Sequence, residues 1–527
     1  MTRAAEAALA QAPGAGGAVR WLVVFGGLLG ALSTVLSATM VNVAVPSIMG
    51  AFGVGQDLAQ FAATAFLATM VASQLLNAWA MQAFGLRASF CGSLAIFIAG
   101  SFIAAGAASI EALVLGRVLQ GFAAGLVQPL VFVAVVAAFP LERRGMAVGL
   151  YSMSVTLAPS FGSYLGGLAI DAFSWREMLL VPLPLVFVAV AIGAAAMPGG
   201  RERVRFPAFD WTGYALVSLA LLCLMSGIGN GARWGWSSDL TVLAFAVGVA
   251  ASILFVQGQR RKGTLLDTSL FSDVRFTSTM LVAFAFGAGN FATNYAIPLF
   301  MQTVQGFTAT DAGLVLVPSG LLLIVLIPIA GRLADAVPSH YPILLGCVMF
   351  AAAAWLLGGA DVNTPFALLV LYGFISRVAL GVVMPNLGKM AMTTVPADKL
   401  SEAAGAYNFL RQMGGSFGVI LTAVSIEMRG ARHADYLAAT QTPDNAQSME
   451  LLARVGELLH RAGVPEAVLR PGALDYLGQV VYAQARTFGF QDTFHYIFFA
   501  FVLALIPAWL LGRAGRGKAR EAAWTSD

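Results

Sequence analysis

Charged residues are scarce in this chain of 527 residues. Asp, Glu, Lys and Arg together make up 11% of the sequence, whereas a soluble domain carries about 25%. Hydrophobic residues make up 59%, and they form long continuous runs rather than the alternating pattern of a membrane β-barrel. This composition excludes an ordinary soluble protein and predicts an all-α integral membrane protein whose main partner is the lipid bilayer.

Cysteine and the usual catalytic motifs are also scarce. The three cysteines, Cys91, Cys223 and Cys347, lie inside apolar runs, so we expect neither a disulfide framework nor a thiolate metal site. The segment 512–519 resembles a phosphate-binding loop, but its Ser or Thr is missing and no strand precedes it. We therefore expect no metal, no cofactor, no ATP-driven pump and no enzyme.

Fourteen apolar runs are long enough to cross a bilayer as helices, which takes about 20 residues at 1.5 Å each. The predicted spans are 21–45, 58–80, 89–108, 111–136, 146–170, 176–197, 211–230, 239–258, 277–302, 311–332, 341–359, 364–388, 402–428 and 490–512. The first run is too long for a cleaved signal peptide, so it is predicted to be a retained helix.

Basic residues are unevenly shared between the short connecting loops. With the N-terminus inside, the short outside loops hold only Arg176 and Arg233, whereas the inside segments hold most of the other arginines and lysines. The segment 429–489 falls outside and is too long to count in this rule. Basic loops stay in the cytoplasm, so both termini are predicted to be cytoplasmic. The net charge of +4 lies largely in these loops, and it does not indicate binding to nucleic acid.

The chain contains an internal repeat. Arg117-Val118 in the fourth span is matched by Arg377-Val378 in the twelfth, and a glycine and then a proline follow each pair. Two six-helix halves related in this way suit a rocking transporter with its substrate site between them. The predicted organisation is a cytoplasmic tail at 1–20, an N-terminal bundle at 21–200, two extra helices at 201–260, a C-terminal bundle at 261–512 that includes an outer segment at 429–489, and a cytoplasmic tail at 513–527.

Three arginines, Arg117, Arg377 and Arg411, lie within the predicted spans. A charge at membrane depth costs several kcal/mol, so it normally faces a cavity or a partner. We expect all three to border a central pathway for a small-molecule substrate. Two alternatives stay open: Arg117 could snorkel to the interface, and each arginine could simply bond helix carbonyls beside a wet cavity.

Several stretches resemble one transporter family. The first helix ends in SATMVNVAVP, the fourth span holds an RxxQG pattern, and the fifth holds APSFGSYLGG. The most specific matches are NYAIPLFMQTVQGFTATDAGLVLVP at 294–318 and YNFLRQMGGSFG at 407–418. In this order they resemble the fourteen-helix drug:proton antiporter branch of the major facilitator superfamily, the EmrB/QacA type.

The resemblance implies the major facilitator fold, with two six-helix bundles plus two extra central helices. It also implies export of small, usually amphipathic molecules from the cytoplasm, driven by protons that flow inward. In the fifth span, the proline and glycines themselves indicate a helix that is packed tightly and bent as part of a gate between the halves, at Pro159, Gly162, Gly166 and Gly167. Plain helix packing is the alternative explanation. Asp335 is the acid of the family's loop motif that helps to close the cytoplasmic side, kept here in the second copy.

Polar residues without charge are the remaining candidate substrate contacts. They either contact the substrate or hold helices together by hydrogen bonds, and the sequence does not separate these roles. The candidates are Ser37, Asn42, Gln128, Asn290, Asn294 and Asn408.

The sequence departs from the family where acids are expected. Ser37 stands in place of the first-helix aspartate, and Gln82 in place of the aspartate of the first loop motif. None of the 26 acids lies at the middle of a span. Glu427, near the outer end of the thirteenth span, is the best candidate for a proton carrier, because burial raises the pKa of a carboxyl group. The alternative is a solvated acid at a helix end.

The sequence therefore predicts a secondary transporter of the bacterial inner membrane that exports drugs or other amphipathic molecules by proton-coupled alternating access. Because the mid-membrane charges are all positive, a dedicated exporter or facilitator of an organic anion, with weak or no proton coupling, stays open. A non-transporting sensor or scaffold is the third possibility. The outer segment 429–489 is expected to form a short helical cap over the exit, or to bind a periplasmic adaptor that leads to an outer-membrane channel.

Overall fold

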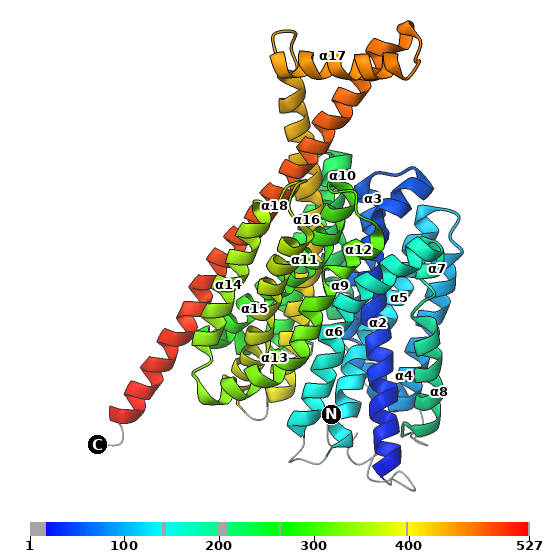
Figure 1. The fold of residues 1–527 in the computed structure, drawn as a ribbon. Helices are drawn as coiled ribbons and strands as arrows, with labels where there is room; N and C mark the ends of the chain where they lie inside the picture. Colours follow the sequence, from blue (N-terminus) through cyan, green and yellow to red (C-terminus); the bar gives the residue numbers. More distant parts are fainter. Residues whose placement is uncertain (1–16, 140–143, 199–207, 263–264, 397–398, 525–527) are drawn as a thin grey trace.

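The computed structural model describes residues 17–139, 144–198, 208–262, 265–396 and 399–524, and all regular structure in these ranges is helical. In chain order the helices are α2 (Gly17–Phe52), α3 (Gln56–Gln74), α4 (Asn77–Ala105), α5 (Ile110–Ala138), α6 (Arg144–Ala172), α7 (Trp175–Met178), α8 (Leu183–Ala196), α9 (Trp211–Trp234), α10 (Asp239–Lys262), η2 (Thr268–Ser272), α11 (Val274–Thr303), α12 (Ala309–Leu314), α13 (Val317–Ala336), α14 (His340–Gly358), α15 (Phe366–Thr393), α16 (Leu400–Ala439), α17 (Ala446–Arg461) and α18 (Glu466–Trp524). Figure 1 shows them as one upright bundle, which confirms the predicted all-α fold.

Twelve helical segments of the described chain are long and apolar enough to cross a membrane. α7 and α8 together form one of them, and α12 with the first part of α13 forms another. The two other predicted spans correspond to α3, which is a shorter apolar helix, and to α6. The count of fourteen membrane crossings stays a prediction, while the multi-pass helical architecture agrees with the sequence.

Some of the helices begin where a side chain satisfies a free amide group. Asp210 accepts a hydrogen bond from the amide of Gly213 at 2.9 Å at the start of α9, and Asp273 does the same for Arg275 at 2.7 Å at the start of α11. The loop expected after the second span is only a one-residue break inside α4. Gly85 has a φ of 79° there, a left-handed conformation that glycine adopts without steric cost.

α5 packs very closely on its neighbours because two of its glycines leave no room for a side chain. A Cβ atom on Gly116 would lie 2.6 Å from the amide nitrogen of Ala104 in α4, and one on Gly121 would lie 2.2 Å from the carbonyl oxygen of Phe66 in α3. Small residues let backbones approach in this way in membrane proteins. This packing encloses the residues that lie between α3, α4 and α5.

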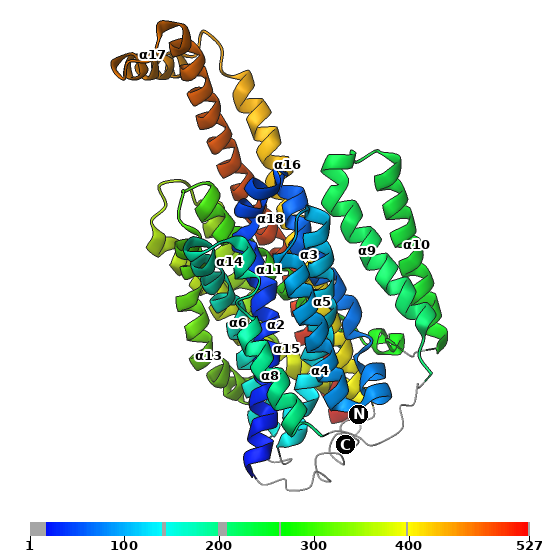
Figure 2. The ribbon, with the colours of Figure 1, turned by 90° about the vertical axis from the view of Figure 1, so that its right-hand side faces the viewer.

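The two extra helices are central in the sequence but peripheral in space. α9 packs against α3 of the first half and α16 of the second, whereas α10 packs mainly on α9. Figure 2 shows the pair standing at one side of the bundle. The two extra helices therefore contact both halves without lying between them.

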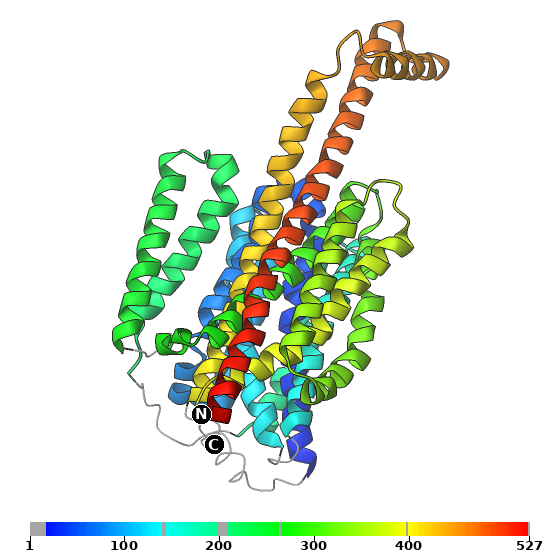
Figure 3. The ribbon, with the colours of Figure 1, turned by 90° about the vertical axis from the view of Figure 1, so that its left-hand side faces the viewer.

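The segment 429–489 forms a stalk rather than a cap. α16 runs on to Ala439, α18 begins at Glu466, and the two continue side by side beyond the bundle, with α17 lying across the tip (Figures 1 and 3). At its base, Asp492 of α18 accepts hydrogen bonds from Arg429 at 2.5 Å and pairs with His433 at 2.8 Å. The expected cap over the exit is wrong, because both membrane helices continue straight outward and carry α17 away from the bundle.

Candidate functional site

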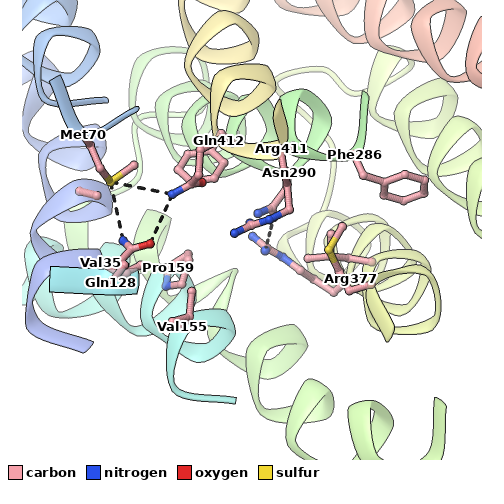
Figure 4. A pocket seen from close by; sticks show the side chains of 15 residues that line it. Val35, Met70, Gln128, Val155, Pro159, Phe286, Asn290, Arg377, Arg411 and Gln412 are labelled. Atoms are coloured by element: carbon pink, nitrogen blue, oxygen red, sulfur yellow. Dashed lines mark hydrogen bonds between the residues drawn. The ribbon is translucent and has the colours of Figure 1, made fainter. Parts of the chain in front are cut away.

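A cavity lies between the two halves of the bundle (Figure 4). Its free volume is about 50 Å³, and the lining residues surround about 590 Å³ when the space that is open to solvent is included. Helices α2, α3, α5 and α6 line it from one side, and α11, α15 and α16 line it from the other. The lining residues are Val35, Ala38, Met70, Gln128, Val155, Pro159, Phe286, Gly287, Asn290, Phe291, Arg377, Leu380, Met384, Arg411 and Gln412.

The two sides of this cavity differ in charge. The second half contributes two arginines, Arg377 from α15 and Arg411 from α16, whereas the first half contributes apolar side chains and one amide, that of Gln128. None of the fifteen lining residues is an acid. The lining is therefore apolar over most of its area and positive on one side.

Arg377 is held by a cluster of neutral amides. Its Nη1 donates to Oδ1 of Asn290 at 2.7 Å, and its Nη2 donates to Oδ1 of Asn294. Asn294 in turn donates to the backbone carbonyl of Asn290 at 2.8 Å. Only 2% of Arg377 is exposed. These amide oxygens solvate the guanidinium group but leave its positive charge uncompensated.

Arg411 has a different environment. It is half-buried on α16, and among the described residues its guanidinium group has neither a hydrogen-bond partner nor an ion-pair partner. Figure 4 shows the side chains of Arg411 and Arg377 among those that line the cavity. Two like charges in a low-dielectric space repel each other, so this part of the cavity favours a negative group.

Gln412 links the two halves across the cavity, and it was absent from the sequence-based candidates. Its Nε2 lies 3.5 Å from Oε1 of Gln128 and 3.9 Å from Sδ of Met70. Its own Oε1 is buried without a hydrogen-bond partner among the described atoms. Gln412 is an uncharged polar residue inside a predicted span, so the criterion that selected Gln128 applies equally to it.

Arg117 does not reach the cavity, which corrects the expectation that it points into the central pathway. It is fully buried. It donates to Ser37 Oγ at 3.0 Å, to Gln120 Oε1 at 2.7 Å and to the carbonyl oxygen of Ala62 at 3.2 Å, and it lies over the ring of Phe66 at 4.2 Å. These partners surround it inside the first half, so it neither lines the pathway nor snorkels. α5 still borders the cavity, through Gln128.

The other polar candidates lie at different places. Ser37 accepts a hydrogen bond from Arg117, and Asn294 accepts one from Arg377. Each therefore holds an arginine in place without lining the cavity itself. Asn42 is buried in α2 outside the lining. Asn408 is exposed on α16 and donates to the carbonyl of Ala404 at 3.1 Å. Of the six uncharged candidates, only Gln128 and Asn290 line the cavity.

The candidate gate in α6 lies along the seam between the halves. Gly162 and Gly166 face α2, where a Cβ atom would lie 2.2 Å from Thr39 Oγ1 and 3.0 Å from the Val43 side chain, respectively. Gly167 faces the second half, where a Cβ atom would lie 2.2 Å from the carbonyl oxygen of Ala309 in α12. Pro159 lies in the cavity lining. The side chain of Asp335 lies outside the described part of the structure.

Hydrogen bonds between the two halves close the bundle at the end that carries the stalk. Gln56 of α3 donates to the hydroxyl of Tyr295 in α11 at 3.1 Å and accepts from Arg486 of α18 at 2.9 Å. Asp171 of α6 accepts from the amide of Thr310 at 2.8 Å. With the Gly167 contact, these bonds hold the halves together on the stalk side of the cavity.

Glu427 lies in a second, smaller cavity. It is half-buried on α16 and shares this cavity with Gln60 and Thr64 of α3 and Gly229 of α9. Gln60 is 2% exposed, and its amide atoms have no hydrogen-bond partner in the described structure. Glu427 therefore faces the contact between the halves and the extra helices, apart from the arginine cavity.

Comparisons with known proteins agree with this architecture. The family described as Major Facilitator Superfamily matches residues 27–419. The multidrug export protein EmrB of Haemophilus influenzae is 28% identical over 481 residues, which cover 90% of this chain and 92% of that protein. The uncharacterized transporter YcnB of Bacillus subtilis, described as MFS-type, is 29% identical over 409 residues, covering 77% of this chain and 86% of the other.

Solved structures share the fold at low sequence identity. A bacterial homologue of the human lysosomal transporter Spinster superposes with a TM-score of 0.61 at 14% identity, covering 94% of this chain and 97% of that one. A D-xylose–proton symporter superposes with a TM-score of 0.56 at 15% identity, covering 77% and 89%. These likenesses concern the arrangement of helices.

Proposed function

The chain belongs to the Major Facilitator Superfamily of membrane transporters, and we propose that it exports drugs or other amphipathic small molecules from the cytoplasm. The observation that carries this proposal is the cavity between the two halves, whose lining combines Met and Phe side chains with a few polar groups. Such a lining suits ligands that are mostly apolar and carry one polar end. The multidrug export protein of Haemophilus influenzae, similar over most of both chains, supports the same direction of transport.

Transport in this proposal is alternating access. The half at 21–200 rocks against the half at 261–512 around the cavity, and the seam at Gly167 and Ala309 opens and closes. Substrate contacts come from Arg377, Arg411, Gln128, Asn290 and Gln412, with Ser37, Asn294 and Arg117 as supports. Pro159, Gly162 and Gly166 shape α6 for this movement, and Asp335 closes the cytoplasmic side.

Glu427 is the proposed proton carrier. It shares a small cavity with Gln60 and Thr64, and the amide of Gln60 offers polar atoms that a protonated or ionised carboxyl group can meet. A partly buried carboxyl group cycles between both forms more readily than an exposed one. Its helix, α16, also carries Arg411 into the central cavity, so protonation and substrate binding act on one element.

We place the protein in the bacterial inner membrane with both termini in the cytoplasm, because the basic loops are expected on that side. The stalk then projects into the periplasm. A periplasmic adaptor with its outer-membrane channel is the proposed partner for this surface. Exposed apolar side chains at the tip and along α18, such as Leu458 and Tyr482, at 64% and 59% exposure, support a protein contact there.

The test is transport by the purified full-length chain in proteoliposomes. We expect an imposed pH gradient to drive accumulation of an amphipathic dye such as a naphthalene sulfonate. Glu427→Gln should abolish the gradient-driven part and keep exchange of labelled for unlabelled substrate. Leu421→Val, an exposed position on the same helix, is the matched control. Gradient-driven transport that persists in Glu427→Gln would refute its role as proton carrier.

A carrier without proton coupling is the second candidate. The observation in its favour is that the described lining of the central cavity holds no acid. Equal transport with and without a pH gradient would support this carrier. A non-transporting sensor or scaffold would be supported by the absence of movement for every probe tested, in vesicles whose protein is folded.

A further inference from the structure

We propose that the central cavity selects amphipathic anions and that Arg411 binds their anionic group. This inference rests on the proposed export function and names the class of molecule that the same site accepts. Its basis is an imbalance of charge: two arginines enter the cavity from the second half, and none of the described lining residues is an acid. An unpaired cation away from water is costly, and a ligand with a negative group removes that cost.

The two arginines are not equivalent. Both terminal nitrogens of Arg377 already donate to amides, those of Asn290 and Asn294. Arg411 makes no such bond among the described residues and is half-buried rather than enclosed. A guanidinium group presents donors in a fork that matches a carboxylate or sulfonate. Arg411 is therefore the group that meets the ligand, and Arg377 adds a fixed positive potential beside it.

The rest of the cavity defines the body of the ligand. Met70, Phe286, Phe291 and Met384 give a flexible apolar and aromatic wall, which suits ring systems of varied shape. The side-chain oxygen Oε1 of Gln412 has no hydrogen-bond partner in the part of the chain that the structure describes, and it accepts one hydrogen bond from the ligand. The expected substrate is a monoanion with an aromatic or aliphatic body. An organic cation meets two like charges there and gains no compensating acid.

The test uses three ligands that share one ring and differ in charge: naphthalene-2-sulfonate, the neutral naphthalene-2-sulfonamide, and 2-naphthylmethylammonium. Each is titrated against the purified full-length protein in detergent, and the rise in melting temperature reports binding to the folded state. We expect half-maximal stabilisation by the sulfonate at a concentration at least tenfold lower than for the sulfonamide. The ammonium compound should give the weakest effect.

Two variants separate charge from packing. Arg411→Gln should remove the tenfold preference for the sulfonate, and Arg411→Lys should keep most of it, while Leu421→Val should match the wild type. A sulfonate preference that survives in Arg411→Gln, or a wild type stabilised equally by all three ligands, would overturn the proposal. The shift in melting temperature is measured without transport. A protein that binds the sulfonate but transports no substrate would therefore refute only the proposed export function.

Discussion

Arg117 and Arg377 occupy equivalent positions in the two halves, yet their environments differ. Arg117 is enclosed by Ser37, Gln120 and Phe66 inside the first half, whereas Arg377 reaches the cavity between the halves. Both are solvated by neutral groups rather than by acids. Both halves therefore carry the same guanidinium group at the repeated position. The packing of each half decides whether a ligand can reach it.

The glycine that follows each arginine explains the difference. A Cβ atom on Gly121 would lie 2.2 Å from the backbone oxygen of Phe66, so α5 lies directly against α3 and covers Arg117. A Cβ atom on the equivalent Gly381 would meet only the ends of the Leu326 and Leu323 side chains, at 2.7 and 2.8 Å. α15 therefore meets its neighbour through flexible side chains, and Arg377, although buried, borders the cavity rather than lying behind a neighbouring helix.

The largest expected effect comes from removing each arginine. Arg117→Ala should destabilise the protein by about 3 kcal/mol, because it leaves a void beside Phe66 and a buried Gln120 without its partner. Arg377→Ala should cost about 1 kcal/mol, because water in the cavity can replace the guanidinium group. Thermal melting of both variants in detergent checks this, and equal losses would contradict the comparison.

The next prediction concerns the replacement of each of these two glycines by alanine. Gly121→Ala should destabilise by about 2 kcal/mol, because the new methyl group meets rigid backbone and forces α5 away from α3. Gly381→Ala should cost about 0.5 kcal/mol or less, because leucine side chains can move aside. Yield of monodisperse protein on size exclusion, together with the melting temperature, gives the measurement. Equal tolerance of the two substitutions would show that close approach does not explain the buried arginine.

The third prediction compares two substitutions, each of which places an acid beside one of the two arginines. Ser37→Asp places a carboxylate next to Arg117, whose Nη1 lies 3.0 Å from the serine hydroxyl. It should stabilise the protein by about 1 kcal/mol by pairing a buried charge. Asn294→Asp should instead neutralise Arg377 and weaken binding of naphthalene-2-sulfonate several-fold. Melting curves with and without the sulfonate test both, and a weaker sulfonate effect in Ser37→Asp would break the distinction between the two arginines.

The smallest effect concerns an ion pair in the second half. Lys399, before α16, donates to Asp267, before η2, at 2.5 Å. This bond lowers the pKa of Asp267 from 3.8 to about 2. Because the folded pKa is lower than the unfolded one, the pair stabilises above about pH 4, and the contribution is lost as the pH falls through 2.

Asp267→Asn should therefore lower stability by about 0.5 kcal/mol at pH 7, as expected for a partly exposed pair. The difference from the wild type should shrink as the pH falls from 4 toward 2. Melting temperatures across this pH range measure it, with Asp361→Asn as a control for an acid elsewhere in the same half. A difference that is constant with pH would remove the ion pair as its cause.

Much of the fold followed from the sequence, and less of the site did. Apolar runs and loop charges predicted the helices and their order, and the repeated Arg-Val pairs pointed to two halves. Substrate binding by the candidate residues stays a prediction, but Arg377, Arg411, Gln128 and Asn290 were found in the cavity lining. Asn408 and Arg117 were not, because helix position alone does not say which neighbours cover a side chain.

The sequence by itself determined that the chain crosses a membrane many times as helices, because burying an apolar run and satisfying its backbone are local requirements. Only the tertiary structure decided that the extra helices lie at one side and that 429–489 extends as a stalk. It also decided that Arg411 has no hydrogen-bond or ion-pair partner within the described ranges, while Arg117 has several. These outcomes depend on contacts between residues far apart in the chain, and local patterns carry no information about such contacts.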